Sequence, residues 1–250
     1  MGEMIEAVSL AKTYPGGTVA VRDVSLTVRR GELYVLMGLS GSGKSTVLRM
    51  LNRLVEPTAG SVSLDGRDLA SLSASELREV RNRRIAMVFQ HFALLPHKSV
   101  RDNAGYGLEI RGLPKRERRE CAQRALEQVG LGDWGDKRPA ELSGGMKQRV
   151  GLARALATEA DVLLMDEPFS ALDPLIRREM QDLLLRLRDG IDRTIVFVTH
   201  DLNEAIRLGD RITLLGSGTV AQTGTAAEIL EAPADDYVAR FVAAERGVAA

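Results

Sequence analysis

G-L-S-G-S-G-K-S-T at residues 38–46 is the stretch that decides the fold of this chain. A short apolar run at residues 33–37 precedes it, as expected of a buried strand, and residues 46–54 continue as a helix. The spacing fits the pattern G-x-x-x-x-G-K-[ST], in which glycines with positive φ let backbone amides converge on phosphate oxygens. A helix after the loop adds the positive end of its dipole. The stretch therefore predicts a nucleotide-binding loop made of Gly38, Leu39, Ser40, Gly41, Ser42, Gly43, Lys44, Ser45 and Thr46.

Two side chains of this loop have a specific expected chemistry. Lys44 is expected to reach the β- and γ-phosphates, and the Ser45 hydroxyl to bind Mg²⁺. A flexible glycine turn is the alternative, but Lys44, Ser45 and Thr46 stand in register between a strand and a helix, which favours nucleotide binding.

A second glycine-rich signal, L-S-G-G-M-K-Q-R, occupies residues 142–149. Ser143 can cap a helix that starts here, and the two following glycines, Gly144 and Gly145, leave N–H donors exposed at the positive end of its dipole. These features suit an anion, although a plain turn with an N-cap is the alternative.

The apolar run at residues 162–165 ends in two carboxylates. Asp166 stands at the carboxyl end of a predicted strand, where α/β sheets place their ligands, and is expected to hold Mg²⁺ through water. Glu167 is expected to polarise the attacking water as general base. A solvated acidic pair is the alternative, and the phosphate loop disfavours it.

Gln90 and His200 each follow a predicted buried strand, at residues 85–89 and 194–199. The Gln90 amide can reach Mg²⁺ and the water while remaining neutral, and the His200 imidazole can bond the γ-phosphate and orient the base. Alone, each would be read as a surface or core residue. At strand ends they predict members of one site.

Composition and charge exclude several other classes of protein. Lys plus Arg is 34 and Asp plus Glu is 34, so the basic footprint of a nucleic-acid-binding protein is absent. Aromatic residues are 4%, which argues against stacking platforms for single strands. Cys121 is the single cysteine and cannot form an internal disulfide. His91 and His97 lack the spacing of zinc ligands.

No apolar run approaches the roughly 18 residues that cross a bilayer, and the first residues do not resemble a secretory signal. The expectation is a soluble cytoplasmic protein whose membrane role comes through a partner subunit.

The rest of the chain alternates strand and helix patterns, which predicts an α/β fold with a mostly parallel sheet. Residues 5–10 and 21–28 read as half-buried strands, residues 65–66 and 216–218 as hairpin turns, and residues 91–138 as a helical insertion. Helices are expected after Asp173, in a capping box at 225–228 and at 235–244. The apolar face of the first of these is predicted to contain Leu175, Ile176, Met180, Leu183, Leu184 and Leu187.

Over essentially its whole length the chain resembles the ATPase domains of the ATP-binding cassette (ABC) family. The resemblance implies a P-loop NTPase (RecA-like) fold: a mostly parallel sheet core, a small antiparallel β subdomain and a helical insertion. It implies one domain, with the core and β subdomain at residues 1–90 and 159–250 and the helical subdomain with the signature motif at 91–158.

The resemblance also gives the motifs their family roles. Residues 38–46 match the Walker A loop, residues 143–145 the signature core, and residues 171–173 the D-loop, which places Asp173 at the nucleotide. Asp166 and Glu167 match Walker B, and Gln90 and His200 match the Q-loop and switch residues. Tyr14 in K-T-Y-P-G-G matches the aromatic residue that stacks on adenine, with ordinary packing as its alternative.

In and around these motifs, several sequence segments resemble one branch of the family, the ATPase subunits of importers for glycine betaine, proline, choline or carnitine. The segments that resemble this branch are L-N-R-L-V-E-P-T at 51–58, F-Q-H-F-A-L-L-P-H at 89–97, L-E-I-R-G at 108–112, S-A-L-D-P-L-I-R at 170–177 and D-Y-V-A-R-F-V at 236–242. Lys147 and Pro168 depart from it, where Gln and Ala are usual. Many members carry a C-terminal pair of CBS modules, which these 250 residues do not contain.

By this resemblance the chain uses ATP and Mg²⁺. It forms a head-to-tail homodimer in the ATP-bound state, in which each signature completes the neighbour's site. It works with transmembrane permease subunits at the cytoplasmic face of the membrane, indirectly with an extracytoplasmic solute-binding protein, and with no nucleic acid. An importer of another solute and an exporter ATPase remain alternatives. A chromosome-type ABC ATPase would need a long coiled-coil insertion, which this sequence does not contain. A translation-type ABC protein would usually carry two cassettes, and this sequence contains one. A small-molecule kinase could use the first glycine-rich loop but has no use for the second.

Overall fold

The computed structural model describes residues 2–90, 94–190 and 193–246 of the 250-residue chain. These residues form two compact units: the first comprises the described residues up to 77 and from 194 onward, and the second those from 78 to 193. Each unit is described by itself below.

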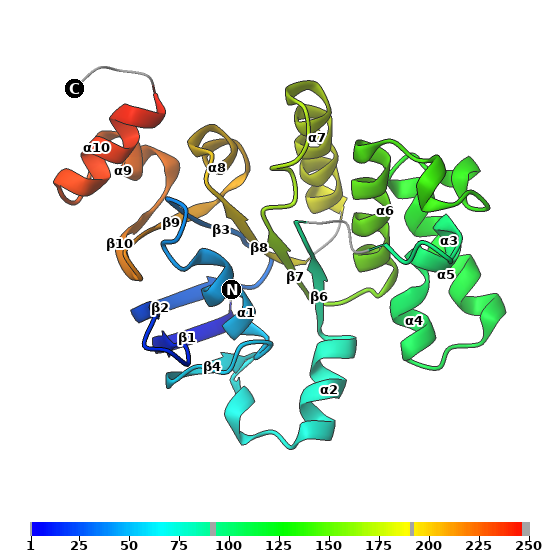
Figure 1. Ribbon diagram of the computed structural model, residues 1–250, viewed down its shortest axis with the longest axis horizontal. Helices are drawn as coiled ribbons and strands as arrows, with labels where there is room; N and C mark the ends of the chain where they lie inside the picture. Colours follow the sequence, from blue (N-terminus) through cyan, green and yellow to red (C-terminus); the bar gives the residue numbers. More distant parts are fainter. Residues whose placement is uncertain (1, 91–93, 191–192, 247–250) are drawn as a thin grey trace. The chain divides into compact units, whose positions relative to one another are not determined.

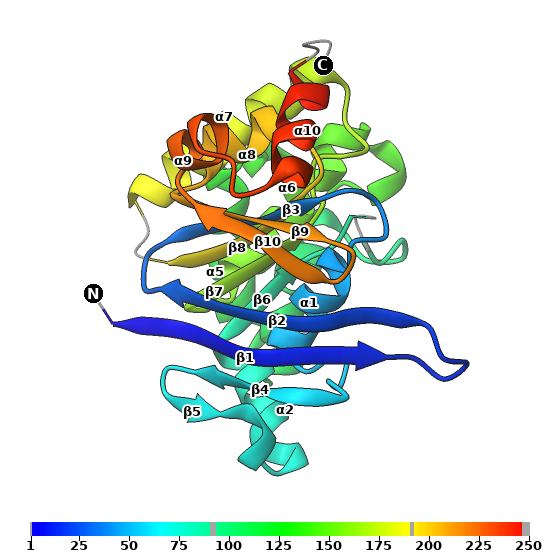
Figure 2. The same ribbon diagram turned by 90° about the vertical axis from the view of Figure 1, so that its left-hand side faces the viewer.

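The first unit is built on one sheet with the strand order β5-β4-β1-β2-β10-β9-β3-β8. The long strand β1 (Glu3–Thr13) pairs antiparallel with β2 (Val19–Arg29) and with β4 (Ala59–Leu64). β5 (Arg67–Asp68) closes a hairpin with β4 through the predicted turn at 65–66. Figure 2 shows these strands lying side by side, with β1 and β2 the longest.

The parallel part of this sheet centres on β3 (Leu33–Gly38), which lies between β8 (Thr194–Thr199) and β9 (Arg211–Gly216). β10 (Thr219–Gly224) turns back antiparallel on β9 through the predicted turn at 216–218. All six residues of β3 and all six of β8 are buried, because helices cover parallel strands on both faces.

Helices of the first unit connect these strands. α1 (Lys44–Leu51) follows β3, and α8 (Leu202–Leu208) follows β8. α9 (Ala226–Glu231) and α10 (Asp236–Glu245) follow β10, and the expected capping box of α9 is present at Thr225 and Glu228. η1 (Leu69–Ser71) follows β5, and α2 (Ala74–Arg83) begins in this unit and ends in the second.

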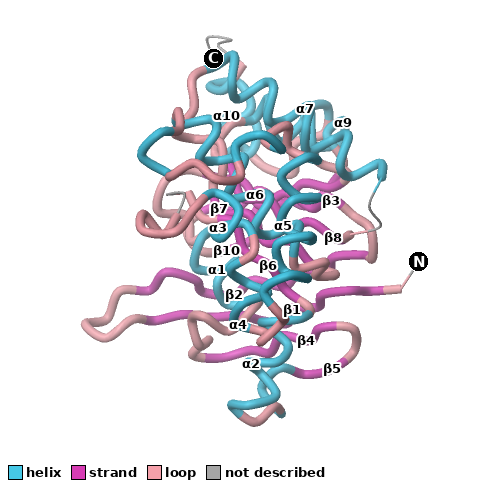
Figure 3. Tube along the Cα trace, turned by 90° about the vertical axis from the view of Figure 1, so that its right-hand side faces the viewer, coloured by secondary structure: helices cyan, strands magenta, loops and turns pink. Residues whose placement is uncertain are grey.

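The second unit combines two parallel strands with a group of helices. β6 (Ile85–Val88) pairs with β7 (Val162–Asp166). Between them in sequence come α3 (Val100–Ala104), α4 (Tyr106–Ile110), α5 (Lys115–Gln128), η2 (Gly132–Trp134), η3 (Pro139–Glu141) and α6 (Gly144–Ala157). α3, α5 and α6 pack against one another, as Figures 1 and 3 show from two sides. α7 (Pro174–Gly190) follows β7.

These elements confirm the predicted α/β class with antiparallel strands and a helical insertion, and two details of the prediction were wrong. The helix after the phosphate loop ends at Leu51 instead of residue 54. Leu175 is 69% exposed instead of part of the apolar face of α7. Its helical neighbours three and four positions on, Arg178 and Glu179, are exposed too, so Leu175 lies on the solvent face while Met180 and Leu184 are buried.

Within the described part of the chain, no helix combines the length and the apolar character that crossing a bilayer requires.

Candidate functional site

The glycine loop after β3 is shaped by contacts that leave no room for side chains. Gly38 has φ +148°, and a Cβ there would collide with the carbonyl oxygen of Leu215 on β9. Gly43 has φ +98°, and its Cβ would lie 2.6 Å from the carbonyl oxygen of Ala20 on β2. Both positions therefore require glycine, for space and for the left-handed backbone.

Lys44 begins α1 and is 4% exposed. Its Nζ donates to the carbonyl oxygens of Gly38 (2.9 Å) and Leu39 (3.0 Å), so the side chain curls over the loop that precedes it. Gly43 is the N-cap of α1 and makes no side-chain cap hydrogen bond. The Lys44 ammonium and the positive end of the α1 dipole together provide a positive environment for phosphate.

Ser42 supplies an independent sign that the loop is built for an anion. It is 5% exposed, and its Oγ has no hydrogen-bond partner among the residues that the structure describes. A buried hydroxyl without a partner costs about 1–3 kcal/mol. A phosphate oxygen would accept a hydrogen bond from this hydroxyl, so the loop residues fit a nucleoside triphosphate.

His200 leaves the same edge of the first unit's sheet as the phosphate loop. β3 and β8 are parallel, with Met37 opposite Thr199, so Gly38 and His200 both follow the carboxyl ends of adjacent strands. The exposed His200 is followed by Asp201, which caps α8 by accepting from the amides of Asn203 and Glu204. The structure thus brings two of the predicted site elements together.

Tyr14 lies in the turn between β1 and β2 and is 36% exposed. Its backbone closes that turn, because its carbonyl accepts from the Gly17 amide (3.1 Å). Lys12 Nζ stands 5.4 Å from the centre of the Tyr14 ring. The ring is therefore accessible to a planar partner, and its stacking on adenine stays a prediction.

The two carboxylates of the second unit differ in their surroundings. Asp166 ends β7 and is 3% exposed. Glu167 follows with φ +44°, a left-handed conformation that is uncommon for a residue with a side chain. Strain of this kind gathers at functional sites, and here it redirects the chain just after the strand.

Gln90 joins this carboxylate turn through Ser170. Val88 of β6 lies opposite Met165 of β7, so both strands end at one edge. Gln90 Nε2 donates to Ser170 Oγ (3.3 Å), and Ser170 Oγ donates to the carbonyl oxygen of Glu167 (3.0 Å). Ser170 was not among the predicted site residues. A serine three positions after Glu167 is a common turn-forming pattern that could have identified it.

The signature motif forms the expected helix start. Ser143 is the N-cap of α6, and its Oγ accepts from the Met146 amide (3.3 Å). Ser143 and Gly144 are exposed. A Cβ on Gly145 would lie 2.5 Å from Ile176 Cγ2 at the start of α7, so this glycine lets the two helix starts approach closely.

Asp173 caps α7, because its Oδ1 accepts from the Ile176 amide (3.0 Å). It is exposed, beside the buried Leu172. The D-loop and signature residues therefore meet at the starts of α6 and α7.

The predicted Mg²⁺ ligands Ser45, Gln90 and Asp166 all offer oxygen, the atom that Mg²⁺ prefers. In the described residues no three or more His, Cys, Asp or Glu side chains gather as a metal site. Mg²⁺ does not need such a cage, since one or two protein oxygens and the phosphates suffice. Of the two histidines considered for zinc, His91 lies outside the described residues.

The predicted residues divide between the two units. The first unit holds Tyr14, the phosphate loop and His200, and the second holds Gln90, Ser143, Gly144, Gly145, Asp166, Glu167 and Asp173.

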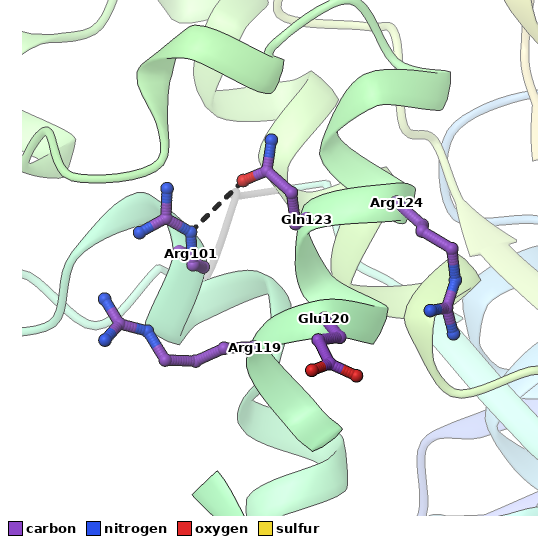
Figure 4. A pocket seen from close by; sticks show the side chains of 5 residues that line it. All are labelled: Arg101, Arg119, Glu120, Gln123 and Arg124. Atoms are coloured by element: carbon purple, nitrogen blue, oxygen red, sulfur yellow. Dashed lines mark hydrogen bonds between the residues drawn. The ribbon is translucent and has the colours of Figure 1, made fainter. Parts of the chain in front are cut away.

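A shallow depression of about 580 Å³ on α3 and α5 of the second unit lies apart from these motifs in sequence. Figure 4 shows Arg101 and Gln123 joined across it by a hydrogen bond of 3.2 Å. The remaining lining residues are Arg119, Glu120 and Arg124. None of the five belongs to the predicted nucleotide site.

Comparison with known proteins identifies the family of this chain. The ABC transporter family profile matches residues 21–170. The glycine betaine/proline betaine transport system ATP-binding protein ProV of Salmonella typhimurium is 59% identical over 226 residues, covering 90% of this chain and 56% of that protein. The trimethylamine N-oxide transport system ATP-binding protein TmoW of Pelagibacter ubique is 49% identical over 233 residues, covering 92% of this chain and 68% of that protein.

Among solved structures, a dimeric ATP-binding cassette in a post-hydrolysis state with ADP and Pi superimposes with a TM-score of 0.81. The two are 35% identical, and the match covers 89% of this chain and 99% of the other. The chain spans slightly more than half the length of the betaine-system relative, 56%.

Proposed function

Because this chain belongs to the ABC transporter family, we propose that it is the ATP-hydrolysing subunit of an importer for glycine betaine, proline or a related quaternary amine. The observation that carries the proposal is the pair of glycine-rich helix starts, one at Gly43 and one at Ser143. The first supplies a phosphate loop with a buried lysine, and the second an exposed, capped helix start that no single-site kinase needs.

The phosphate loop binds the triphosphate of ATP. Lys44 moves from the carbonyls of Gly38 and Leu39 to the β- and γ-phosphates, and the Ser42 hydroxyl donates to a phosphate oxygen. Tyr14 stacks on adenine. These contacts fix the γ-phosphorus for in-line attack, and positioning and charge stabilisation supply most of the catalysis.

Glu167 accepts the proton of the attacking water, and His200 and Gln90 hold the γ-phosphate and that water in line. Ser45, Gln90 and Asp166 would hold Mg²⁺, which would neutralise phosphate charge when bound. Ser170 keeps the Gln90 amide close to the Glu167 turn.

Two copies close head to tail around two ATP molecules, with Ser143, Gly144 and Gly145 of one copy on the nucleotide of the other. The similarity to a dimeric cassette supports this arrangement. ATP binding closes the dimer and hydrolysis reopens it, since each ligand state favours one arrangement. Permease subunits hold the pair at the cytoplasmic face of the membrane and receive the solute from an extracytoplasmic binding protein.

Glu167→Gln is the test of the hydrolytic role. The substitution keeps the shape of the side chain and removes its basicity, so hydrolysis should slow by at least ~10²-fold while ATP still binds. The variant should also accumulate as an ATP-bound dimer on size-exclusion chromatography. Lys44→Ala is the matched control, which should lose nucleotide binding itself. Turnover near that of the wild type in Glu167→Gln would reject the assignment of the base.

Trimethylamine N-oxide is a second candidate solute, because a transport ATPase for it is 49% identical to this chain. Uptake of labelled glycine betaine and of labelled trimethylamine N-oxide should be compared in cells that lack this gene. We expect betaine uptake to be lost, and to return with the wild-type gene but not with Glu167→Gln. Loss confined to trimethylamine N-oxide uptake would favour the second solute.

A further inference from the structure

The segment D-Y-V-A-R-F-V at residues 236–242 distinguishes the branch in sequence, yet it has no part in the chemistry proposed above. It forms most of α10, which the Asp235 side chain caps by accepting from the Val238 amide (2.8 Å). Val238, Phe241 and Val242 are buried, so the helix is anchored to its unit. α10 contacts α9 and β10, and Figure 2 shows it beside the β9–β10 strand pair.

Tyr237 connects this helix to β9 in two ways. Its hydroxyl donates to the carbonyl oxygen of Leu215 (3.3 Å). Its ring lies against Gly216, where a Cβ would come within 2.8 Å of the ring atom Cε1. Gly216 therefore leaves space that the Tyr237 ring fills, and the position of the ring depends on the absence of a side chain there.

Leu215 borders the phosphate loop directly. It lies opposite Gly38 in the β3–β9 pair, and its carbonyl oxygen occupies the space that a Cβ on Gly38 would need. The same Cβ would lie 2.7 Å from Ser42 Oγ, the buried hydroxyl without a described partner. One carbonyl thus touches both the Tyr237 hydroxyl and the first residue of the phosphate loop.

We propose that Tyr237 is a positioning residue for the phosphate loop, through which α10 sets the affinity of the site for a nucleoside triphosphate. A displacement of α10 releases the Leu215 carbonyl, and Gly38 moves with it because the two backbones are in contact. Hydrogen bonds weaken steeply as distance and angle depart from their optimum, so small shifts of the loop amides lower triphosphate affinity. Tyr237 does not touch the reacting atoms, and the rate of the chemical step is unaffected. The inference rests on the proposed binding of ATP at residues 38–46.

Tyr237→Phe removes the hydroxyl and keeps the ring. We expect it to raise the Kd of a fluorescent ATP analogue with Mg²⁺ by about two- to tenfold, the range of one hydrogen bond. KM for ATP should rise by the same factor with kcat unchanged, and the melting temperature without nucleotide should stay near that of the wild type. A role in stability alone would lower the melting temperature and leave KM in place.

Gly216→Ala tests the ring contact, because the added methyl pushes Tyr237 away from Leu215. Gly216→Ala should weaken binding of the ATP analogue in the wild-type background and should have little further effect in the Tyr237→Ala background. The effects of the two substitutions should therefore be non-additive. Arg240→Ala is the matched control on the same helix, since Arg240 Nε donates to the Asp236 carbonyl within α10. Its Kd should equal that of the wild type.

Lys44→Ala in the same titration separates the positioning role of Tyr237 from the proposed binding of ATP. If the wild type binds the analogue, Lys44→Ala does not, and Tyr237→Phe and Gly216→Ala bind as the wild type does, the positioning role is overturned and the proposed function stands. If the wild type itself fails to bind, the proposed function and this inference fall together.

Discussion

Individual residues of the phosphate loop are determined by neighbours far away in the sequence. Gly38 is restricted by Leu215, and Gly43 by Ala20, through backbone carbonyls that leave no space for Cβ. Ser42 is buried without a described partner, which is unfavourable until an acceptor arrives. The loop therefore carries a small energetic cost that binding of phosphate offsets.

Tyr14 gives a prediction at the same scale. The residue is 36% exposed in a turn, where its ring can stack on a base. Tyr14→Ala should weaken ATP binding by about 1–3 kcal/mol, as measured for other aromatic–base stacks, and Tyr14→Phe or Trp should be tolerated. Isothermal titration with Mg-ATP measures the difference. Lys12→Ala, which removes the cation beside the ring, is the control for indirect effects. An unchanged affinity in Tyr14→Ala would mean that the residue only packs.

At the scale of elements, the starts of α6 and α7 depend on each other through Gly145 and Ile176. Gly145→Ala would place a methyl 2.5 Å from Ile176 Cγ2. Such overpacking should lower the free energy of unfolding by about 1–3 kcal/mol, measured by urea denaturation. Gly144→Ala is the matched control, because its Cβ would meet no described atom within 4 Å.

A second substitution should restore the stability that Gly145→Ala loses. Ile176→Ala removes the clashing methyl, so Gly145→Ala should cost much less in that background. An equal cost in both backgrounds would show that the backbone of Gly145 matters instead of its contact with Ile176.

The start of α2 gives a prediction about pH. Hydrogen bonds from the Ser73 hydroxyl and amide, and then from Arg67, lower the pKa of the exposed Glu76 from 4.5 to about 2. A carboxylate with a lowered pKa contributes stability that is fully present above its unfolded value and is lost as pH falls through the folded value.

The measurement is the melting temperature of the wild type minus that of Glu76→Gln, followed with pH. The difference should be constant near neutral pH and should shrink as pH falls from 4.5 towards about 2. Ser73→Ala, which removes the first hydrogen bond, should move this window to higher pH. A difference that does not vary with pH would contradict the role of the carboxylate.

At the scale of the whole molecule, the proposal requires two copies of the chain. Ser143 is exposed at a capped helix start and belongs to the second unit, whereas Lys44 belongs to the first. Ser143→Arg and Lys44→Ala should each abolish ATPase activity nearly completely. In a mixed dimer, one composite site combines an intact Lys44 with an intact Ser143, so mixing should restore part of the activity.

If each site instead used Ser143 and Lys44 of one copy, no mixing ratio would restore activity. A mixed dimer that forms in a pull-down yet stays inactive points to obligatory coupling of two sites. A disulfide between Cys residues introduced at positions 143 and 41 then decides, because sharing predicts a crosslink between copies that forms with ATP.

Much of the fold could be predicted because its signals are local. The caps at Ser143, Thr225 and Asp235 lie three residues from the amides they accept from, so a short window contains both partners. The strand–glycine–helix order of residues 33–51 is local in the same way. α2 escaped prediction because none of its residues is buried, and without an apolar face there is no periodicity to detect.

The sequence by itself determined where the phosphate loop and the signature lie and which chemistry to predict for them, since both predictions follow from residue types at fixed short spacing. Only the tertiary structure decided at which positions no residue but glycine fits, and that Leu175 faces solvent. It also decided that Ser170 joins Gln90 to the Glu167 turn and that Tyr237 contacts the strand beside Gly38. These contacts join residues up to 199 positions apart (237 against 38). Their geometry depends on strand register and helix packing, which the burial of the whole core fixes and no short window contains.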